Sequence, residues 1–432
     1  MNRDAAWHAF HPSSFVPLAG PMRSCCAHSS LPTVCRSLPV RCDANEAVSR
    51  PSRRSLGVVL TGVAAGTAAF QLSTRGYPLP LAPAGGYAVS GADVRLPCGS
   101  SSFRARVLWP CAPDDRSGPS LPYMGTGDDG QAQADSLAGL VRLPSILTAH
   151  LATARSGVRL GAPPLPGPWP VLCYSHGYGG NAQMGTLVLR EIASFGCVVL
   201  AVEHTDGSAS RTVRADGSVL RFGERPEGGR TTGVALRAAE LTAAADAVRS
   251  RSSALPPGVA AVCNLERLFI GGHSYGAPTA LLALRSAQAG IIKGALLHDP
   301  ALVMMAGGQL VAPPCPVLAL LSDEYTASAE YLRPPAVALV QAAPEGSALY
   351  HLIGSAHGNY VDAPFWAARL VMRTLARLGI PASGAGDQVA TLRAIGTTAA
   401  AFLGGADAGA AAFAAGEPLL EPLVVQPRTA AR

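Results

Sequence analysis

The chain has 432 residues, of which 48% are hydrophobic and 14% are charged, so it can bury a sizeable core in one or two domains. Its formal charge is +6, but residues 1–75 carry eight arginines against three acidic residues, which leaves the remainder close to neutral. This distribution argues against a large basic surface for nucleic acid. The cysteines form no CxxC pair, so no metal site is expected.

Residues 1–75 are expected to be a transit or signal segment that does not belong to the fold. Residues 1–52 are rich in Ser, Arg and Pro and poor in acidic residues, which is typical of an organelle transit peptide. Arg53 and Arg54 then precede a short apolar run, 56–70, and a membrane span would need about 20 residues. This two-part signal predicts delivery to the chloroplast and onward to the thylakoid lumen. Mitochondrial import is the alternative.

Residues 76–380 are expected to form one catalytic domain, because short apolar runs alternate there with helical segments. The expected strands are 103–109, 171–175, 197–202, 268–272, 294–299, 317–323 and 348–354. The expected helices are 181–195, 232–249, one after Gly276 and one from about Pro364. This alternation predicts an α/β fold with a mostly parallel central sheet and helices on both faces. Residues 381–432 are rich in Ala and Gly and are expected to be a loosely ordered tail.

Two features near the front of this domain leave alternatives open. Cys98 and Cys111 flank the expected strand 103–109 and could form a disulfide in an oxidising compartment, or they could be small buried apolar side chains. Residues 136–154 carry apolar side chains at spacings that suit one helical face, interrupted at Pro144.

The sequence GHSYG, residues 272–276, is the strongest functional signal. It fits the pattern G-x-S-x-G and lies between an expected strand and an expected helix, which is the context of a nucleophile elbow. A tight turn of this kind brings backbone segments so close that flanking side chains would clash. Ser274 is therefore the candidate nucleophile, raised above the edge of the sheet at the start of a helix.

A serine nucleophile needs a base and an acid that orients the base, and the chain offers both in the order Ser, Asp, His. Asp299 ends one expected strand, and His357 follows another. Asp323 ends the strand between them and is a second candidate for the acid. The residues alone leave the choice between Asp299 and Asp323 open.

The oxyanion formed during acyl transfer needs two backbone donors. One is expected to be the amide of Tyr275, directly after the nucleophile. The other is expected from the glycine-rich turn in VLCYSHGYGGN, residues 171–181, where we favour the amide of Tyr178.

Five blocks of this sequence resemble, in order, those of the platelet-activating factor acetylhydrolase family of the plasma and intracellular type II sort. They are YSHGYG (174–179), AVEHTDGSAS (201–210), GGHSYGA (271–277), LLHDPAL (296–302) and GSAHGNYVD (354–362). The run 203–210 in the second block is the most telling, because general serine hydrolases have no reason to share it. The resemblance implies an α/β-hydrolase fold and, without cofactor or calcium, release of short or oxidised acyl chains from phospholipids. It also favours Asp299 over Asp323 as the acid.

The resemblance further implies docking on lipid surfaces through helices near 136–154. The alternative is that this segment packs on the core. Ala277 replaces the second glycine usual in the family, which leaves the acyl-chain length and the head group open. The sequence does not indicate an oligomeric state.

Two other functions are compatible with part of the sequence. A chlorophyllase-like or general carboxylesterase fits plastid targeting and the elbow, although chlorophyllases usually have arginine where this chain has Tyr275. A catalytically silent α/β-hydrolase acting as a binding protein would typically lack one of the three catalytic side chains, and here all three are present.

Overall fold

The computed structural model describes residues 81–113, 118–140, 144–224, 229–286, 290–305, 311–367, 372, 374, 382–404 and 417–426. The expected targeting segment, 1–75, lies outside these residues, as does most of the helix expected from Pro364. None of the helices within the described ranges is both long and apolar enough to cross a membrane.

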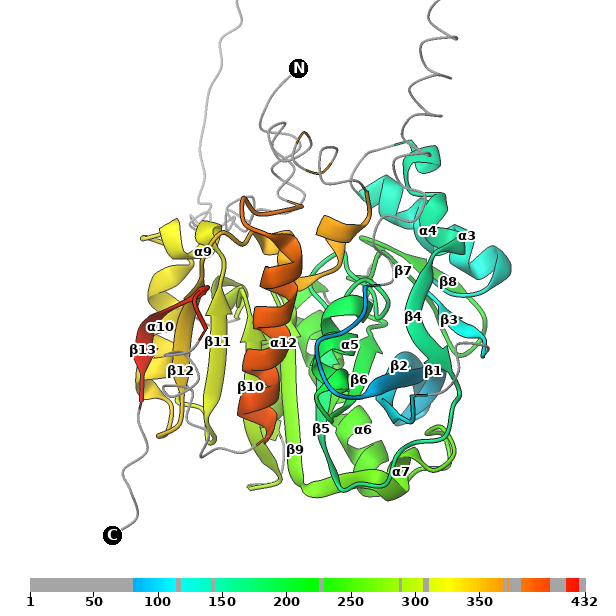
Figure 1. Cartoon of the computed structure of the whole chain (residues 1–432), viewed down its shortest axis with the longest axis horizontal. Coiled ribbons are helices and arrows are strands. Elements are labelled where there is room, and N and C mark those ends of the chain that lie inside the picture. Colours follow the sequence, from blue (N-terminus) through cyan, green and yellow to red (C-terminus); the bar gives the residue numbers. More distant parts are fainter. Residues whose placement is uncertain are drawn as a thin grey trace, which may run out of the picture.

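Eleven strands form one sheet in the order β13-β12-β11-β10-β9-β5-β6-β2-β1-β4-β3, and the run from β12 to β6 is parallel (Figure 1). The parallel strands are β5 (Trp169–Ser175), β6 (Val198–Glu203), β9 (Cys263–His273), β10 (Ile292–His298), β11 (Val317–Leu321) and β12 (Ala348–Leu352). The outer strands are β1 (Ala88–Cys98), β2 (Ser101–Cys111), β3 (Ser120–Pro122), β4 (Arg155–Leu160) and β13 (Leu420–Val425). A separate hairpin joins β7 (Arg211–Val213) to β8 (Val219–Arg221).

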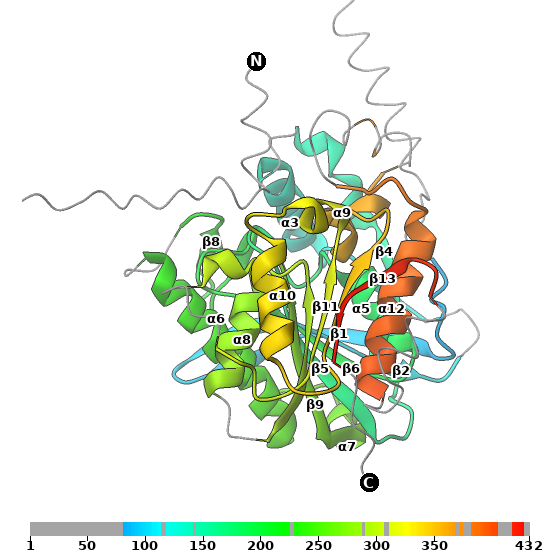
Figure 2. The same ribbon diagram turned by 90° about the vertical axis from the view of Figure 1, so that its left-hand side faces the viewer.

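Helices cover both faces of this sheet, as the two views show (Figures 1 and 2). One face carries α6 (Gly229–Arg249), α8 (Gly276–Ser286) and α10 (Arg333–Ala342), and the other carries α5 (Thr186–Ser194) and α12 (Gln388–Gly404). The expected sheet with helices on both faces is therefore confirmed. The remaining helical elements are α3 (Gly127–Leu140), η2 (Ser145–Leu147), α4 (His150–Thr153), α7 (Val259–Val262), η3 (Leu302–Met304), α9 (Asp323–Ala327), η4 (His357–Tyr360) and η5 (Ala363–Phe365).

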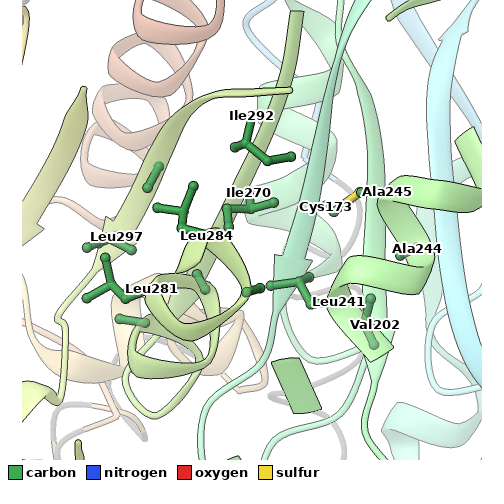
Figure 3. Packing of buried hydrophobic residues seen from close by; sticks show 14 of the residues in the cluster. Cys173, Val202, Leu241, Ala244, Ala245, Ile270, Leu281, Leu284, Ile292 and Leu297 are labelled. Carbon is green, nitrogen blue, oxygen red and sulfur yellow. The ribbon is translucent and has the colours of Figure 1, made fainter. Parts of the chain in front are cut away.

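The central strands are largely apolar, since most of their residues are buried on both faces of the sheet. Successive side chains of a strand point to opposite faces. Cys173 and Ile270 point toward α6 and α8, where Figure 3 shows them among buried side chains such as Leu241. Leu172 and Phe269, their neighbours along the strands, belong to the second core beneath α5 and α12. Two cores thus hold the sheet rigid between them.

The C-terminal region differs from the expected loose tail. Helix α12 packs against α5, and β13 pairs antiparallel with β12 at the edge of the sheet. The small residues that made this region look like a low-complexity tail permit close helix packing, since a Cβ at Gly396 would lie 2.3 Å from Glu191 Cγ. The fold therefore continues beyond residue 380, while residues 405–416 and 427–432 lie outside the described part.

The segment 136–154 forms the end of α3, then η2 and α4, with residues 141–143 outside the described ranges. Leu137 and Leu151 are buried in a small cluster with Tyr123 and Met184, so these two side chains pack on the body of the protein. Ile146 is 45% exposed. Lipid contact by this segment remains a prediction.

Cys98 and Cys111 are not joined by a disulfide. The antiparallel register pairs Cys98 with Ser101 and Cys111 with Ala88, which places the two cysteines at opposite ends of the β1–β2 ladder.

We expect that removal of residues 417–432 destabilises the protein. The deletion removes β13, exposes the outer edge of β12 and uncovers the pocket filled by Leu420, which is 6% exposed. The midpoint of thermal unfolding, measured by circular dichroism, should fall by about 5 °C. Removal of 427–432, which leaves β13 in place, is the control. Equal midpoints for both shortened chains would show that β13 adds nothing to stability.

Candidate active site

Ser274 lies in a strained turn between β9 and α8. Its φ is +55°, in the left-handed region that side chains other than glycine rarely adopt. Glycine is required on both sides, since a Cβ at Gly272 would lie 2.3 Å from the carbonyl oxygen of Gly276, and one at Gly276 would lie 2.1 Å from that of Ser175. The expected elbow geometry is therefore present, with the nucleophile candidate at the carboxyl edge of the sheet.

Asp299 and His357 are hydrogen bonded to each other at the same edge. His357 Nδ1 donates to Asp299 Oδ2 at 2.9 Å. The Asp299 carboxylate is fully buried and also accepts the Ser322 amide at 2.7 Å and the Ser322 hydroxyl at 2.6 Å. Both oxygens of the Asp299 carboxylate thus accept hydrogen bonds, and the bond from His357 holds the imidazole with a proton on Nδ1.

Asp323, the other acid considered, has different partners. Its Oδ1 accepts from His351 Nε2 at 2.7 Å and from the Gly354 amide at 2.9 Å. The hydrogen bonds therefore assign Asp299, and not Asp323, to His357.

Aromatic rings fix the plane of the His357 imidazole. The Tyr325 ring lies parallel to it, with centroids 5.1 Å apart, and the His273 ring lies 4.3 Å away on centroids. The backbone amide of His357 donates to Glu324 Oε2 at 3.0 Å. These contacts limit the imidazole to one orientation, in which Nδ1 meets Asp299.

Ser274 belongs to the same neighbourhood, since it directly follows His273, whose ring centroid lies 4.3 Å from that of His357. No hydrogen bond joins Ser274 to His357 within the described part of the chain, so the third expected contact of the triad is not formed in this structure. Contacts between a nucleophile and its base are often long in enzymes without substrate and tighten when substrate binds.

The histidines next to this group are neutral. Burial lowers the pKa of His273 well below its usual value, and burial lowers that of His298 to about 3. His357 can therefore take up a proton without a second imidazolium beside it.

The turn expected to supply the second oxyanion donor lies directly against the nucleophile. A Cβ at Gly177 would lie 3.1 Å from Ser274 Cβ, a tighter contact than most Cβ atoms make, and glycine avoids it. The Tyr178 and Tyr275 rings meet edge to face with centroids 5.7 Å apart. The two backbone segments chosen from the sequence as oxyanion donors are thus neighbours beside Ser274.

Several side chains of this site carry no sequence signal of their own. Ser322 donates to Asp299, Glu324 accepts from the His357 amide and Tyr325 stacks on the imidazole. The short string SDEY, residues 322–325, does not reveal these contacts. In the described ranges, no group of three or more His, Cys, Asp or Glu side chains is arranged to hold a metal ion.

The two acids make a direct test of this geometry. Asp299→Asn should lower kcat for a simple ester by about 10⁴-fold, because the amide no longer stabilises the required tautomer and charge of His357. Asp323→Asn should lower it by less than about 10-fold, since its partner is His351. Circular dichroism of both variants controls for folding. A larger loss in Asp323→Asn would contradict the assignment.

Comparisons with known proteins agree with this architecture. The model of the family platelet-activating factor acetylhydrolase, isoform II, matches residues 80–224 and 261–419. A search of curated proteins gave no match. Among solved structures, the fold is similar to a ferulic acid esterase from Streptomyces cinnamoneus, with a TM-score of 0.59 and 18% identity over 74% of this chain and 91% of the esterase.

The family match covers well over half of the chain and includes all three candidate catalytic residues. The similarity to the esterase supports the α/β-hydrolase fold. The chain therefore belongs to the platelet-activating factor acetylhydrolase, isoform II, family, and is a hydrolase that acts on esters.

Proposed function

We propose that the protein hydrolyses acyl esters through a serine nucleophile and an acyl-enzyme intermediate. The observation that carries this proposal is the buried Asp299–His357 hydrogen bond beside Ser274 in a glycine-flanked elbow. A carboxylate that orients an imidazole, and an imidazole placed near a serine, are the components of acyl transfer by a serine hydrolase.

In the proposed reaction the Ser274 hydroxyl attacks the acyl carbon while His357 Nε2 takes its proton. Asp299 holds the tautomer and stabilises the imidazolium. The amides of Tyr178 and Tyr275 bind the oxyanion of the tetrahedral intermediate. When this intermediate collapses, the alcohol leaves with the proton from His357. Water, activated by the same imidazole, then releases the acid and restores Ser274.

For the substrate we propose phospholipids with short or oxidised acyl chains, cleaved without calcium. Membership in the family supports this choice. The three components named above also speak against a catalytically silent binding protein, since none of them has been replaced.

Labelling with a fluorophosphonate tests the nucleophile. The wild-type chain should acquire one phosphonyl group on Ser274, located by peptide mass spectrometry, and Ser274→Ala should acquire none. Hydrolysis of a simple ester should fall by about 10⁶-fold in the same variant. Labelling of another serine, or retained turnover in Ser274→Ala, would refute the mechanism.

A substrate panel tests the proposed specificity. A phospholipid with an acetyl group at the second position should be cleaved much faster than its long-chain counterpart, and addition of a calcium chelator should leave the rate unchanged. Hydrolysis of the chlorophyll ester without any phospholipid cleavage would favour a chlorophyllase-like enzyme. Cleavage of simple esters alone would favour a general carboxylesterase.

A further inference from the structure

The block EHTDGSAS, residues 203–210, begins at the last residue of β6 and is hydrogen bonded to the expected oxyanion turn. The Gly179 amide donates to the Ser208 carbonyl at 2.7 Å, and the Ser210 amide donates to the Gly180 carbonyl at 2.8 Å. Asn181 Nδ2 donates to Ser210 Oγ at 3.0 Å. The most distinctive block of the sequence thus has a structural task, since it pairs with the loop that carries Tyr178.

Arg237 of α6 lies at the centre of this region, and its side chain is fully buried. Toward the turn after β5, its guanidinium donates to Ser175 Oγ at 3.0 Å and to the His176 carbonyl. It also donates to Ser208 Oγ in the EHTDGSAS block. One side chain therefore fixes both the turn and the segment that supports it.

The same guanidinium reaches the other oxyanion segment, at the start of α8. Its Nε donates to Thr279 Oγ1 at 2.9 Å, and the Thr279 hydroxyl in turn donates to the Tyr275 carbonyl at 3.1 Å. The guanidinium carbon lies 4.8 Å from the centroid of the Tyr275 ring, a cation–π contact. Helices α6 and α8 run side by side on one face of the sheet, so the Arg237 side chain on α6 can contact Thr279 on α8 directly (Figure 2).

Ser175 also takes part in a second series of polar contacts, with His204 and Glu240. Ser175 Oγ lies 2.8 Å from His204 Nε2, and His204 Nδ1 lies 2.7 Å from Glu240 Oε2. Burial lowers the pKa of His204 well below its usual range, and burial raises that of Glu240 to about 8. The three residues repeat the serine, histidine and acid order, but all are buried and Ser175 is bonded to Arg237, so no substrate can reach them.

A buried cation is costly unless it is paired, and the nearest carboxylate oxygen of Asp206 is 3.9 Å from the guanidinium. The planar guanidinium offers five donors in a fixed arrangement, which an ammonium group lacks. The donors of Arg237 bind partners on three separate segments of the chain, which are the turn after β5, the block 203–210 and helix α8.

From these contacts we propose that Arg237 is a positioning residue that fixes the Tyr178 turn relative to the Tyr275 turn and so sets the separation of the two oxyanion amides. The inference rests on the proposed function, because it concerns the transition state of the same site. The inference predicts that replacement of Arg237 weakens binding of tetrahedral species more than binding of the unreacted ester.

The test uses Arg237→Lys, which keeps the positive charge and loses the planar arrangement of five donors. The control is Arg249→Lys at the end of the same helix, where the arginine side chain is 40% exposed. Arg237→Lys should lower kcat by about 10²-fold with KM changed less than about 3-fold. Affinity for an alkyl boronic acid, which forms a tetrahedral adduct on the serine, should fall by the same factor as kcat/KM. Affinity for a non-hydrolysable ether analogue of the ester should stay constant, and Arg249→Lys should match wild type.

Thr279→Val is the second variant in case Arg237→Lys does not fold. It leaves Arg237 in place, removes one link to the Tyr275 turn and should lower kcat by about 10-fold with the same selective loss of boronate affinity. Equal losses for both ligands, or unchanged kcat in a folded variant, would overturn the inference. Failure of Ser274 to label in the wild-type chain would instead refute the proposed function, whatever the Arg237 variants do.

Discussion

The hydrogen bond from His357 to Asp299 is the interaction on which the rest of the site depends. It joins the ends of β10 and β12 across β11, and Ser322 after that middle strand completes the carboxylate's partners. Because the carboxylate is fully buried, it is held in one place and its charge is little screened by water. The imidazole therefore has a defined tautomer before any substrate arrives.

This arrangement requires strained backbone conformations at the edge of the sheet. Ser274 and Asp299 both have positive φ values, 55° and 44°, although neither is glycine. Such conformations persist only when the surroundings determine them, and they cluster at functional sites. Here the surroundings are two packed cores and parallel strands, which keep β9 and β10 in register and bond the Ser274 amide to the His298 carbonyl at 2.9 Å.

Much of this could be predicted from the sequence, because the informative patterns are local. Short apolar runs alternating with helical segments predicted the central strands, and the elbow predicted where the turn around Ser274 would lie. The ends of parallel strands meet at one edge, so Asp299 and His357 were expected there. The choice against Asp323 needed the family resemblance, since both acids end neighbouring strands, and the hydrogen bonds to His357 and His351 now separate them.

Other features depend on contacts between distant segments, which no local pattern reveals. The Ala- and Gly-rich composition of α12 suggested disorder, although it permits the close approach at Gly396. Arg237 lies in an expected helix but contacts residues 29 and 61 positions away in the sequence. A crystal structure of the phosphonate adduct of Ser274 would test the account most directly. It should show His357 Nδ1 still on Asp299, Nε2 on the serine oxygen, and a phosphonyl oxygen bound by the amides of Tyr178 and Tyr275. An adduct with His357 turned away from Asp299, or with its oxygens directed into solvent, would contradict it.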